Sequence, residues 1–350
     1  MTFYDEWLGM WSQATEEKAR ARKVTHEEDV QWVETVQDYR VGLLIAPELG
    51  FRTWGTESLI AEIPPGGHTG KHKHGEESIH IVEGSGFSII SGVRYDWKKN
   101  STLQIPFGAE HQHFNTGNQT ARYFSAMSVH LEQFCGIHRH TQLEERGEIR
   151  VLPSVPPSAN GFDERGRRIC LQIEEAPVRL GGEGPPGGVP VIEPGKPLVV
   201  GTLDGMQALG GMVHKAKLVN FMRIGKPNNG FQAFETEISG ILTDAPHEYG
   251  GTHAHMEAHL YILDGEGHSV VDGESIPWKK GTAFQVVGPQ TVHQHVNDSD
   301  VESQMLRVAF GIRYFFEAAA KEEFPYLFLA YRQGIVGREA ERERVRERTR

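Results

Sequence analysis

Two His-x-His motifs in this sequence are each followed further downstream by another histidine. Alternate residues of a β-strand point to the same face of a sheet, so the two imidazoles of each motif face the same way. Three imidazoles on one side of a divalent metal leave other coordination positions open, which allows non-haem iron to bind a substrate and dioxygen together. Two metal sites are therefore predicted. The first consists of His72, His74 and His111, and the second of His253, His255 and His293.

Other histidines near these motifs are candidates for acid/base or hydrogen-bonding roles, although a single histidine is more often exposed or satisfied locally. By strand parity, His113 and His295 point the same way as His111 and His293 and could line the same cavities. His113 and His80 are the candidate catalytic residues of the first site.

An internal repeat surrounds both motifs. GFRTWGTE at 50–57 recurs as GFQAFETE at 230–237, and HQHFN at 111–115 recurs as HQHVN at 293–297. Further blocks between residues 57 and 111 recur in the same order between residues 237 and 293. Such self-similarity predicts two homologous domains.

The segments that must position the histidines are short, rich in β-branched and aromatic residues, and bounded by Gly, Pro and Asn. Examples are SLIAEIPPGG at 58–67, SIHIVEGSGFSII at 78–90 and STLQIPFG at 101–108. The 40 glycines and 18 prolines also suit many short strands joined by tight turns. The pattern predicts an all-β chain built from antiparallel barrels or jelly rolls.

Composition excludes several classes of partner and location. A formal net charge of −11 repels phosphate backbones and anionic lipid, so neither nucleic acid nor a membrane surface is expected as a partner. Cys135 and Cys170 are too few for a disulfide framework, and the N-terminal residues have no signal-peptide pattern. No apolar stretch is long enough to span a membrane. These features predict a cytoplasmic protein.

The histidine motifs carry a resemblance to the cupin superfamily. GGHTGKHKHGEESIHIVEGSG at 66–86 resembles its first motif, and PFGAEHQHFN at 106–115 resembles its second, with Pro-x-Gly-x-x-His and an asparagine beyond. GPQTVHQHVN at 288–297 lacks the Pro-x-Gly. The resemblance implies two tandem cupin barrels, also called double-stranded β-helices or jelly rolls, with helical N- and C-terminal extensions.

The resemblance also implies an acidic ligand. Counted back from the glycine that closes the first motif, Glu77 occupies the position of the family's acidic ligand, although the loop before it is short. Its equivalent in the second repeat is Ala258. The two sites therefore differ, and the first is the expected catalytic centre.

Among two-domain cupins the chain looks most like the gentisate 1,2-dioxygenase group, from about residue 39 to 316. This implies Fe(II), with Mn, Ni, Co or Zn as other metals, and insertion of O2 into a hydroxylated aromatic substrate with C–C cleavage. The group's arginine before the closing glycine is replaced by Ile79 and Leu260. A substrate carboxylate is therefore either absent or held by Arg94, Arg122 or another cation.

Two further functions stay open. A quercetinase-like dioxygenase or another metal-dependent cupin enzyme is favoured if Glu77 is a ligand. A non-catalytic bicupin that binds a small ligand is the alternative outside enzymes, although all six repeat histidines are present.

The predicted organisation follows from the repeat and its flanks. It comprises a helical N-terminal arm at 1–40, a first cupin domain at 41–150, a Pro/Gly-rich linker at 151–200, a second cupin domain at 201–316 and a C-terminal helical tail at 317–350. Aromatic-rich segments at both ends suggest subunit contacts, so a homo-oligomer is expected.

Overall fold

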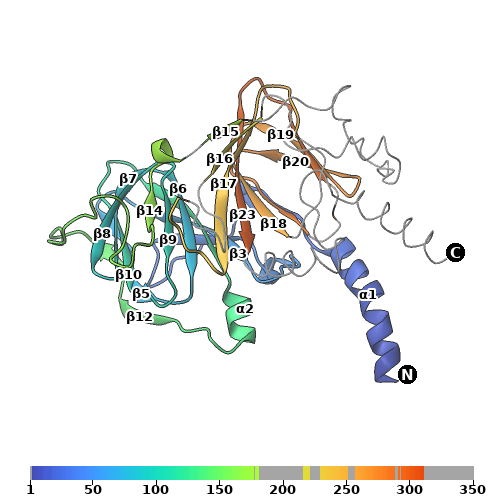
Figure 1. Cartoon of the computed structure of the whole chain (residues 1–350), viewed down its shortest axis with the longest axis horizontal. Coiled ribbons are helices and arrows are strands. Elements are labelled where there is room, and N and C mark those ends of the chain that lie inside the picture. Colours follow the sequence, from blue (N-terminus) through green and yellow to red (C-terminus); the bar gives the residue numbers. More distant parts are fainter. Residues whose placement is uncertain are drawn as a thin grey trace.

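The computed structural model describes residues 2–176, 229–250, 257–287, 291 and 293–310, and the backbone of 178–180 and 216–220. The predicted C-terminal tail at 317–350 lies outside the described residues. The chain is mostly β, as predicted, and its two barrels lie side by side (Figure 1). In the described part of the chain, no helix is long and apolar enough to cross a membrane.

The first barrel is made of two antiparallel sheets, each ordered by strand pairing. One sheet contains, in order, β14 (Cys170–Leu171), β9 (Thr102–Ile105), β6 (Glu77–Glu83), β11 (Ala121–Met127), β3 (Glu57–Ile63) and β2 (Arg40–Ile45). The other contains β12 (Thr141–Glu144), β5 (Lys71–Lys73), β10 (His111–Asn115), β4 (Gly67–His68) and β13 (Gly147–Glu148), with β7 (Ser85–Ile90) on β10 and β8 (Val93–Lys98) on β7.

The second barrel repeats this arrangement. Its larger sheet contains, in order, β1 (Val24–Thr25), β21 (Ala283–Val286), β18 (Ala258–Asp264), β23 (Ser303–Phe310), β17 (Thr236–Asp244), β16 (Ala216–Asn220) and β15 (Val178–Leu180). The smaller contains β20 (Glu274–Lys279), β19 (Glu266–Val271) and β22 (His293–Asn297). The helices are α1 (Phe3–Arg20) and α2 (Val129–Phe134), with 3-10 turns η1 (Glu27–Asp29), η2 (Pro47–Leu49) and η3 (Ile173–Glu175).

Equivalent tight turns hold the hairpins that flank the histidine strands. Ser91 and Gly92 join β7 to β8 with φ of 49° and 80°, and Asp272 and Gly273 join β19 to β20 with φ of 49° and 85°. Positive φ at both central residues matches the right-handed twist of a two-residue hairpin. The turn sequences therefore fix the register of the strands beside β10 and β22.

The segments that precede each repeat exchange between the barrels. Val24 of β1 pairs with Phe284 of the second barrel, and Cys170 of β14 pairs with Leu103 of the first. The amide of Arg22 donates to the carbonyl of Gly50 at 3.0 Å, as that of Arg168 does to Gly230 at 2.9 Å. The duplicated unit thus begins earlier than the sequence blocks indicate.

This exchange changes two of the predicted segments. In the described part of the predicted arm 1–40, only α1 is an α-helix, and the chain that follows it contains β1, which adds a two-residue strand to the second barrel, and the 3-10 turn η1. The predicted linker 151–200 likewise contains β14, which closes one edge of the first barrel.

A shared hydrophobic core joins the two barrels. The outer faces of β3, β6 and β11 pack against those of β17, β18 and β23. Phe124 and Tyr261 meet at the centre, with ring centroids 5.3 Å apart. Burial of this apolar area stabilises the barrel pair at about 25 cal/mol per Å² removed from water.

A pair of buried glutamates adds polar contacts to this core. Glu76 of the first barrel accepts the backbone N–H groups of Phe234 and Glu235, both at 2.9 Å. Glu257 of the second accepts that of Trp54 at 2.6 Å. A carboxylate of each barrel therefore binds backbone N–H groups in a loop of the other barrel. Glu76 is buried rather than solvated.

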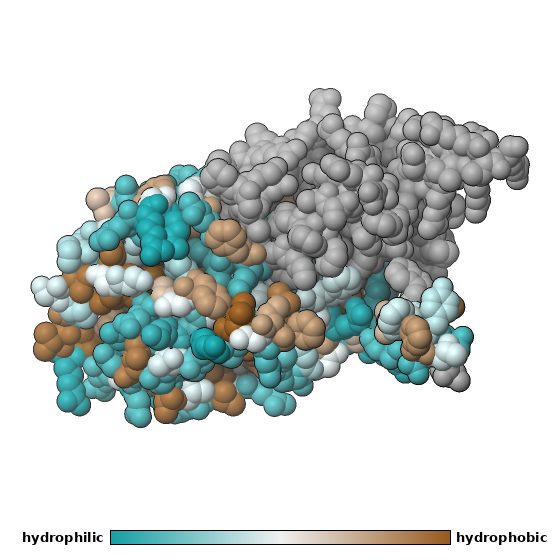
Figure 2. Space-filling model, turned by 60° about the horizontal axis from the view of Figure 1, so that its bottom comes forward, coloured by the Kyte–Doolittle hydropathy of each residue, from teal (hydrophilic) through white to brown (hydrophobic). Residues whose placement is uncertain are grey.

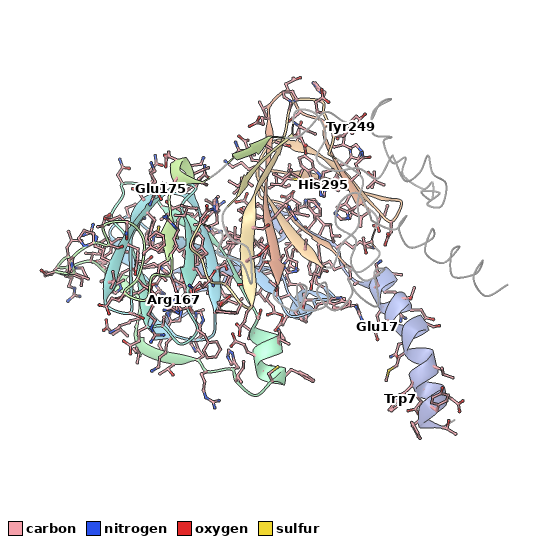
Figure 3. All side chains as sticks on the ribbon, in the orientation of Figure 1. Trp7, Glu17, Arg167, Glu175, Tyr249 and His295 are labelled. Carbon is pink, nitrogen blue, oxygen red and sulfur yellow. The ribbon has the colours of Figure 1, made fainter. Side chains whose placement is uncertain are left out.

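The helix α1 projects from the barrels (Figure 1) and carries exposed apolar side chains, among them Phe3, Trp7 and Leu8. Trp7 lies towards its outer end (Figure 3). Over the first barrel, by contrast, apolar residues are scattered among polar ones (Figure 2). Subunit contact through α1 stays a prediction.

Candidate metal centre

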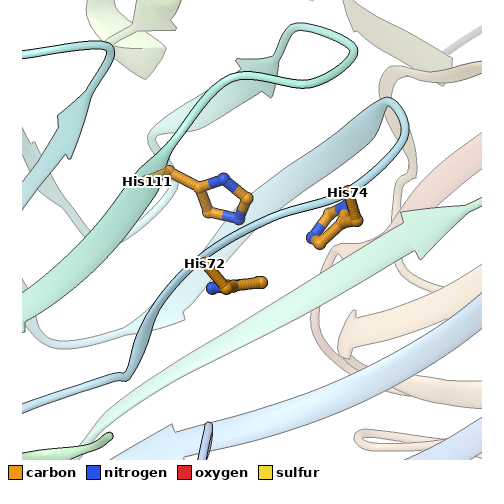
Figure 4. Close-up of side chains that lie close together, drawn as sticks. All are labelled: His72, His74 and His111. Atoms are coloured by element: carbon orange, nitrogen blue, oxygen red, sulfur yellow. The ribbon is translucent and has the colours of Figure 1, made fainter. Parts of the chain in front are cut away.

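Three of the predicted ligands converge in the first barrel. His72 lies on β5, His74 directly follows it, and His111 begins β10, where it pairs with His72 across the sheet. Their ring centroids lie 4.1 Å apart for His72 and His111, and 4.8 Å for His74 and His111 (Figure 4). One nitrogen from each ring lies within 4.8 Å of the others, a spacing that one metal ion could bridge.

The second nitrogen of each ring sets its tautomer. Nδ1 of His72 lies 3.4 Å from the carbonyl of Gly70, and Nδ1 of His111 lies 2.9 Å from that of Ala109. Nδ1 of His74 likewise contacts the backbone at 3.1 Å. A carbonyl can only accept, so Nδ1 carries the proton and Nε2 keeps its lone pair for a metal.

The rings of His72 and His74 are neutral as well as oriented. Burial, followed by the neighbouring rings, lowers the pKa of His72 to about 2. Burial also lowers the pKa of His74 to about 4, although Glu77 opposes it. Neutral imidazole is the form that binds a metal.

Glu77 lies against the same centre. Its Oε2 atom is 3.5 Å from Nε2 of both His74 and His111, and the hydroxyl of Ser125 donates to its Oε1. Burial acts to raise the pKa of Glu77, but its contact with His111 and the nearby rings hold that pKa well below its ordinary value.

This arrangement fits a cation. With Nδ1 of His111 donating to the backbone, Nε2 of His111 and Oε2 of Glu77 are two acceptors facing each other in a buried site. Such facing lone pairs repel unless a cation lies between them. The histidines and the glutamate therefore form a possible metal site, which Glu77 extends to four donors.

A cavity of about 280 Å³ opens on this cluster. Its volume lies near the lower end of the range for small-molecule sites, which is typically about 300–1,000 Å³. The lining includes His72, His74, Glu77 and His113, with Asp38 and Tyr123.

His113 reaches the cavity in the other tautomer. The indole N–H of Trp97 donates to Oγ of Ser88 at 2.9 Å, and Oγ of Ser88 lies 2.6 Å from Nδ1 of His113. If the serine hydroxyl donates in turn, Nδ1 of His113 is the acceptor and Nε2 carries the proton. Burial lowers the pKa of His113 to about 3, so the ring is neutral. His113 then offers a hydrogen-bond donor beside the ligands.

The second barrel repeats this series of tryptophan, serine and histidine contacts at the equivalent positions. Trp278 donates to Ser269 at 3.0 Å, and Ser269 lies 2.8 Å from Nδ1 of His295, which is labelled in Figure 3. The duplication thus preserves the tautomer-setting contact as well as the histidine.

The tautomer assigned to His113 can be tested by Ser88→Ala. Without the serine proton, His113 loses its preference for the Nε2–H form, and its nitrogen-15 chemical shifts should move towards a tautomer mixture. We expect turnover to fall about 10- to 100-fold, as for other groups that orient a site, with metal content unchanged. Ser269→Ala removes the same tryptophan acceptor in the second barrel and is the matched control. Unchanged His113 shifts in Ser88→Ala would contradict the tautomer assignment.

His80 does not line this cavity. It lies three residues beyond Glu77 on β6, so it points to the opposite face of the strand, and its Nδ1 contacts Oγ1 of Thr102 at 3.0 Å. Its predicted catalytic role is therefore not retained.

The two arginines considered for a substrate carboxylate also lie elsewhere. Arg122 is paired with Glu27 and Glu62, and Arg94 is paired with Asp96 at 2.7 Å. Neither is among the residues that line the cavity.

The second predicted site is described only in part. His253 and His255 lie outside the described residues. His293 is buried at the start of β22, with its Nδ1 3.0 Å from the carbonyl of Thr291. Ala258 is buried at the start of β18, so the described part of this site has no counterpart of Glu77.

Tyr123 and Asp38 are among the cavity residues that were not anticipated. Tyr123 alternates along β11 with Ser125, which bonds Glu77, so strand parity could have identified it. Asp38 comes from a bend before β2, where no repeat or periodicity gives a signal. The hydroxyl of Tyr123 donates to Oδ1 of Asp38 at 3.0 Å, and burial raises the pKa of Asp38 to about 6.

Comparisons with known proteins agree with this architecture. The family model described as "Cupin domain" matches residues 59–127 and 240–309. An uncharacterized protein of Methanocaldococcus jannaschii is 35% identical over 68 residues, which are 18% of this chain and 54% of that protein. The chain thus matches about half the length of this relative.

Solved structures share the two-barrel fold at low identity. Salicylate 1,2-dioxygenase of Pseudoaminobacter salicylatoxidans, in a structure of its adducts with gentisate, matches with a TM-score of 0.53, 13% identity and coverage of 89% of this chain and 81% of that one. A mutant of Bacillus subtilis oxalate decarboxylase matches with a TM-score of 0.58, 12% identity and 89% coverage of each chain. The two matched regions thus give the chain two cupin domains, and the likenesses to solved structures show the same two-barrel fold.

Proposed function

We propose that the chain is a non-haem Fe(II)-dependent dioxygenase that cleaves a C–C bond of a hydroxylated aromatic substrate in its first barrel. One observation carries the proposal: three buried histidines direct Nε2 towards one point beside the buried Glu77, at the wall of a cavity of about 280 Å³. Ligands gathered on one side leave positions open towards the cavity.

The metal and the protein have separate roles in this proposal. A metal held by His72, His74, His111 and Glu77 would supply a Lewis acid, a template and a path for electrons between substrate and dioxygen. His113 donates its Nε2 proton in a hydrogen bond to a substrate oxygen, which orients the ring at the open positions. The burial of all these side chains limits access of water.

The presence of Glu77 favours one alternative, a quercetinase-like activity, because that group uses a glutamate beside its histidines. A non-catalytic bicupin that binds a small ligand is the alternative from another class. Metal analysis separates it from the enzymes. Fewer than about half an atom of Fe, Mn, Ni, Co or Zn per purified chain would contradict a metalloenzyme, because imidazole and carboxylate ligands arranged in this way bind such ions tightly.

Oxygen uptake by the iron-loaded protein tests the reaction. The panel comprises gentisate, salicylate, catechol, hydroquinone and the flavonol quercetin, and we expect uptake and loss of the ring absorbance with at least one compound. Uptake with quercetin alone would favour the quercetinase-like activity. No uptake with any compound would refute ring cleavage.

A further inference from the structure

The charge of the first cavity restricts what it can hold. Among the described residues that line it, Asp38, Glu77 and Glu132 carry carboxyl groups, and no lysine or arginine is present. Glu77 faces the ligand histidines, and Glu132 contacts Nδ1 of His138 at 3.0 Å. A bound divalent metal would keep one net positive charge once Glu77 is counted, and no lysine or arginine of the described lining offsets the carboxylate of Asp38.

Arg146 acts on Asp38 from outside the cavity. Its Nε donates to the carbonyl of Thr35 at 2.7 Å, its NH2 group pairs with Glu34 at 2.9 Å, and its guanidinium stacks on Tyr39. These contacts engage its Nε and one of its two terminal nitrogens, and Arg146 does not line the cavity. It is therefore held away from any substrate carboxylate.

Asp38 and Tyr123 form a recognition pair opposite the ligand histidines. The hydroxyl of Tyr123 donates to Oδ1 of Asp38 at 3.0 Å, and the Tyr123 ring lies 5.5 Å from that of His113. Oδ2 of Asp38 has no protein donor among the described residues. A carboxylate oxygen with a free lone pair is an acceptor for a substrate hydroxyl.

We propose that the first barrel binds a hydroxylated ring that has no carboxylate, with one hydroxyl donated to Asp38 and oriented by Tyr123. This inference rests on the proposed function, since it names the substrate class of the same site. A carboxylate on the same ring would add a second negative charge near Asp38, where the described lining has no lysine or arginine, and such like-charge contact opposes binding. Asp38 is thus a residue that determines specificity.

Matched ligand pairs test the proposal directly. Hydroquinone and gentisate differ by one carboxylate, as do catechol and 2,3-dihydroxybenzoate. Binding to the iron-loaded full chain is measured by calorimetry without oxygen, so the result does not depend on turnover. We expect the carboxylate-free member of at least one pair to bind at least ~10-fold more tightly to the wild type.

Two variants assign the effect to Asp38. Asp38→Asn keeps the shape and removes the charge, so the preference within the pair should fall by at least ~5-fold, with iron content unchanged. Asp96→Asn makes the same change at an exposed acid of β8 that is paired with Arg94, and its preference should equal that of the wild type.

Three outcomes would overturn the inference: equal or tighter binding of the carboxylates, an unchanged preference in Asp38→Asn, or no binding of any of the four compounds. The proposed function can fail separately. Preferential binding of hydroquinone or catechol without oxygen uptake would refute the dioxygenase and keep the substrate class. Uptake with gentisate alone would keep the dioxygenase and refute the class.

Discussion

His111→Ala is expected to empty the first barrel of metal and to lower oxygen uptake by at least ~100-fold, which is the upper range for losing a residue that only supports a ligand. His111 is the residue that pairs β10 with β5 and also faces Glu77 at 3.5 Å. Its loss leaves His72, His74 and Glu77 as ligands. It also removes the most enclosed of the three histidine ligands. His72→Ala should have the same effect.

Metal content by elemental analysis and oxygen uptake with the active compound of the panel are the measurements. His268→Ala is the control, because this histidine lies on the outside of the second barrel, where it pairs with Asp298. Circular dichroism should show that His111→Ala keeps the fold. Wild-type iron content and uptake in His111→Ala would refute the first barrel as the metal centre.

The fold and the position of this centre could be predicted because both depend on local patterns. Period-two alternation places His72 and His74 on one face, and the repeat places a third histidine at the start of the equivalent strands β10 and β22. The same alternation explains why His80, which was predicted to be catalytic, does not face the cavity. Counting from Glu77 along β6 sends His80 to the outer face, where the barrels pack.

Other features depend on contacts between distant segments and leave no local signal. Asp38 reaches the cavity only because the chain before β2 packs across its mouth, where the amide of Gly70 donates to the carbonyl of Gln37 at 2.8 Å. The exchange of β1 and β14 between the barrels likewise leaves no local signal in the sequence. Two-residue strands have too little pattern to be recognised before their partners are known.

The inter-barrel glutamates illustrate the same point with a stability consequence. In the sequence, Glu76 and Glu77 are neighbours of one kind, but β6 sends Glu77 into the first barrel while Glu76 turns to the second. Burial raises the pKa of Glu76 to about 7. Glu77 thus lies at the candidate metal centre and Glu76 joins the barrels. Substitutions at the two positions should therefore have separate effects, on metal binding and on stability.

Glu76→Ala is expected to lower the free energy of unfolding by about 2–4 kcal/mol, because it leaves the buried N–H of Thr236 and the partly buried N–H groups of Phe234 and Glu235 without their acceptor. Urea denaturation, followed by far-ultraviolet circular dichroism, measures this loss at the first transition. Glu76→Gln keeps an acceptor oxygen of the same shape, and since burial already favours the neutral acid, it should recover most of the stability.

A surface glutamate gives the matched control for this loss. Glu83, at the end of β6, pairs with Lys280 of the other barrel at 3.6 Å, but both side chains are about half exposed. Exposed ion pairs contribute roughly 0–1 kcal/mol, so Glu83→Ala should change stability by at most that amount. If Glu76→Ala were as mild as Glu83→Ala, the buried carboxylate would not hold the barrels together, and the shared apolar core around Phe124 and Tyr261 would have to do so alone.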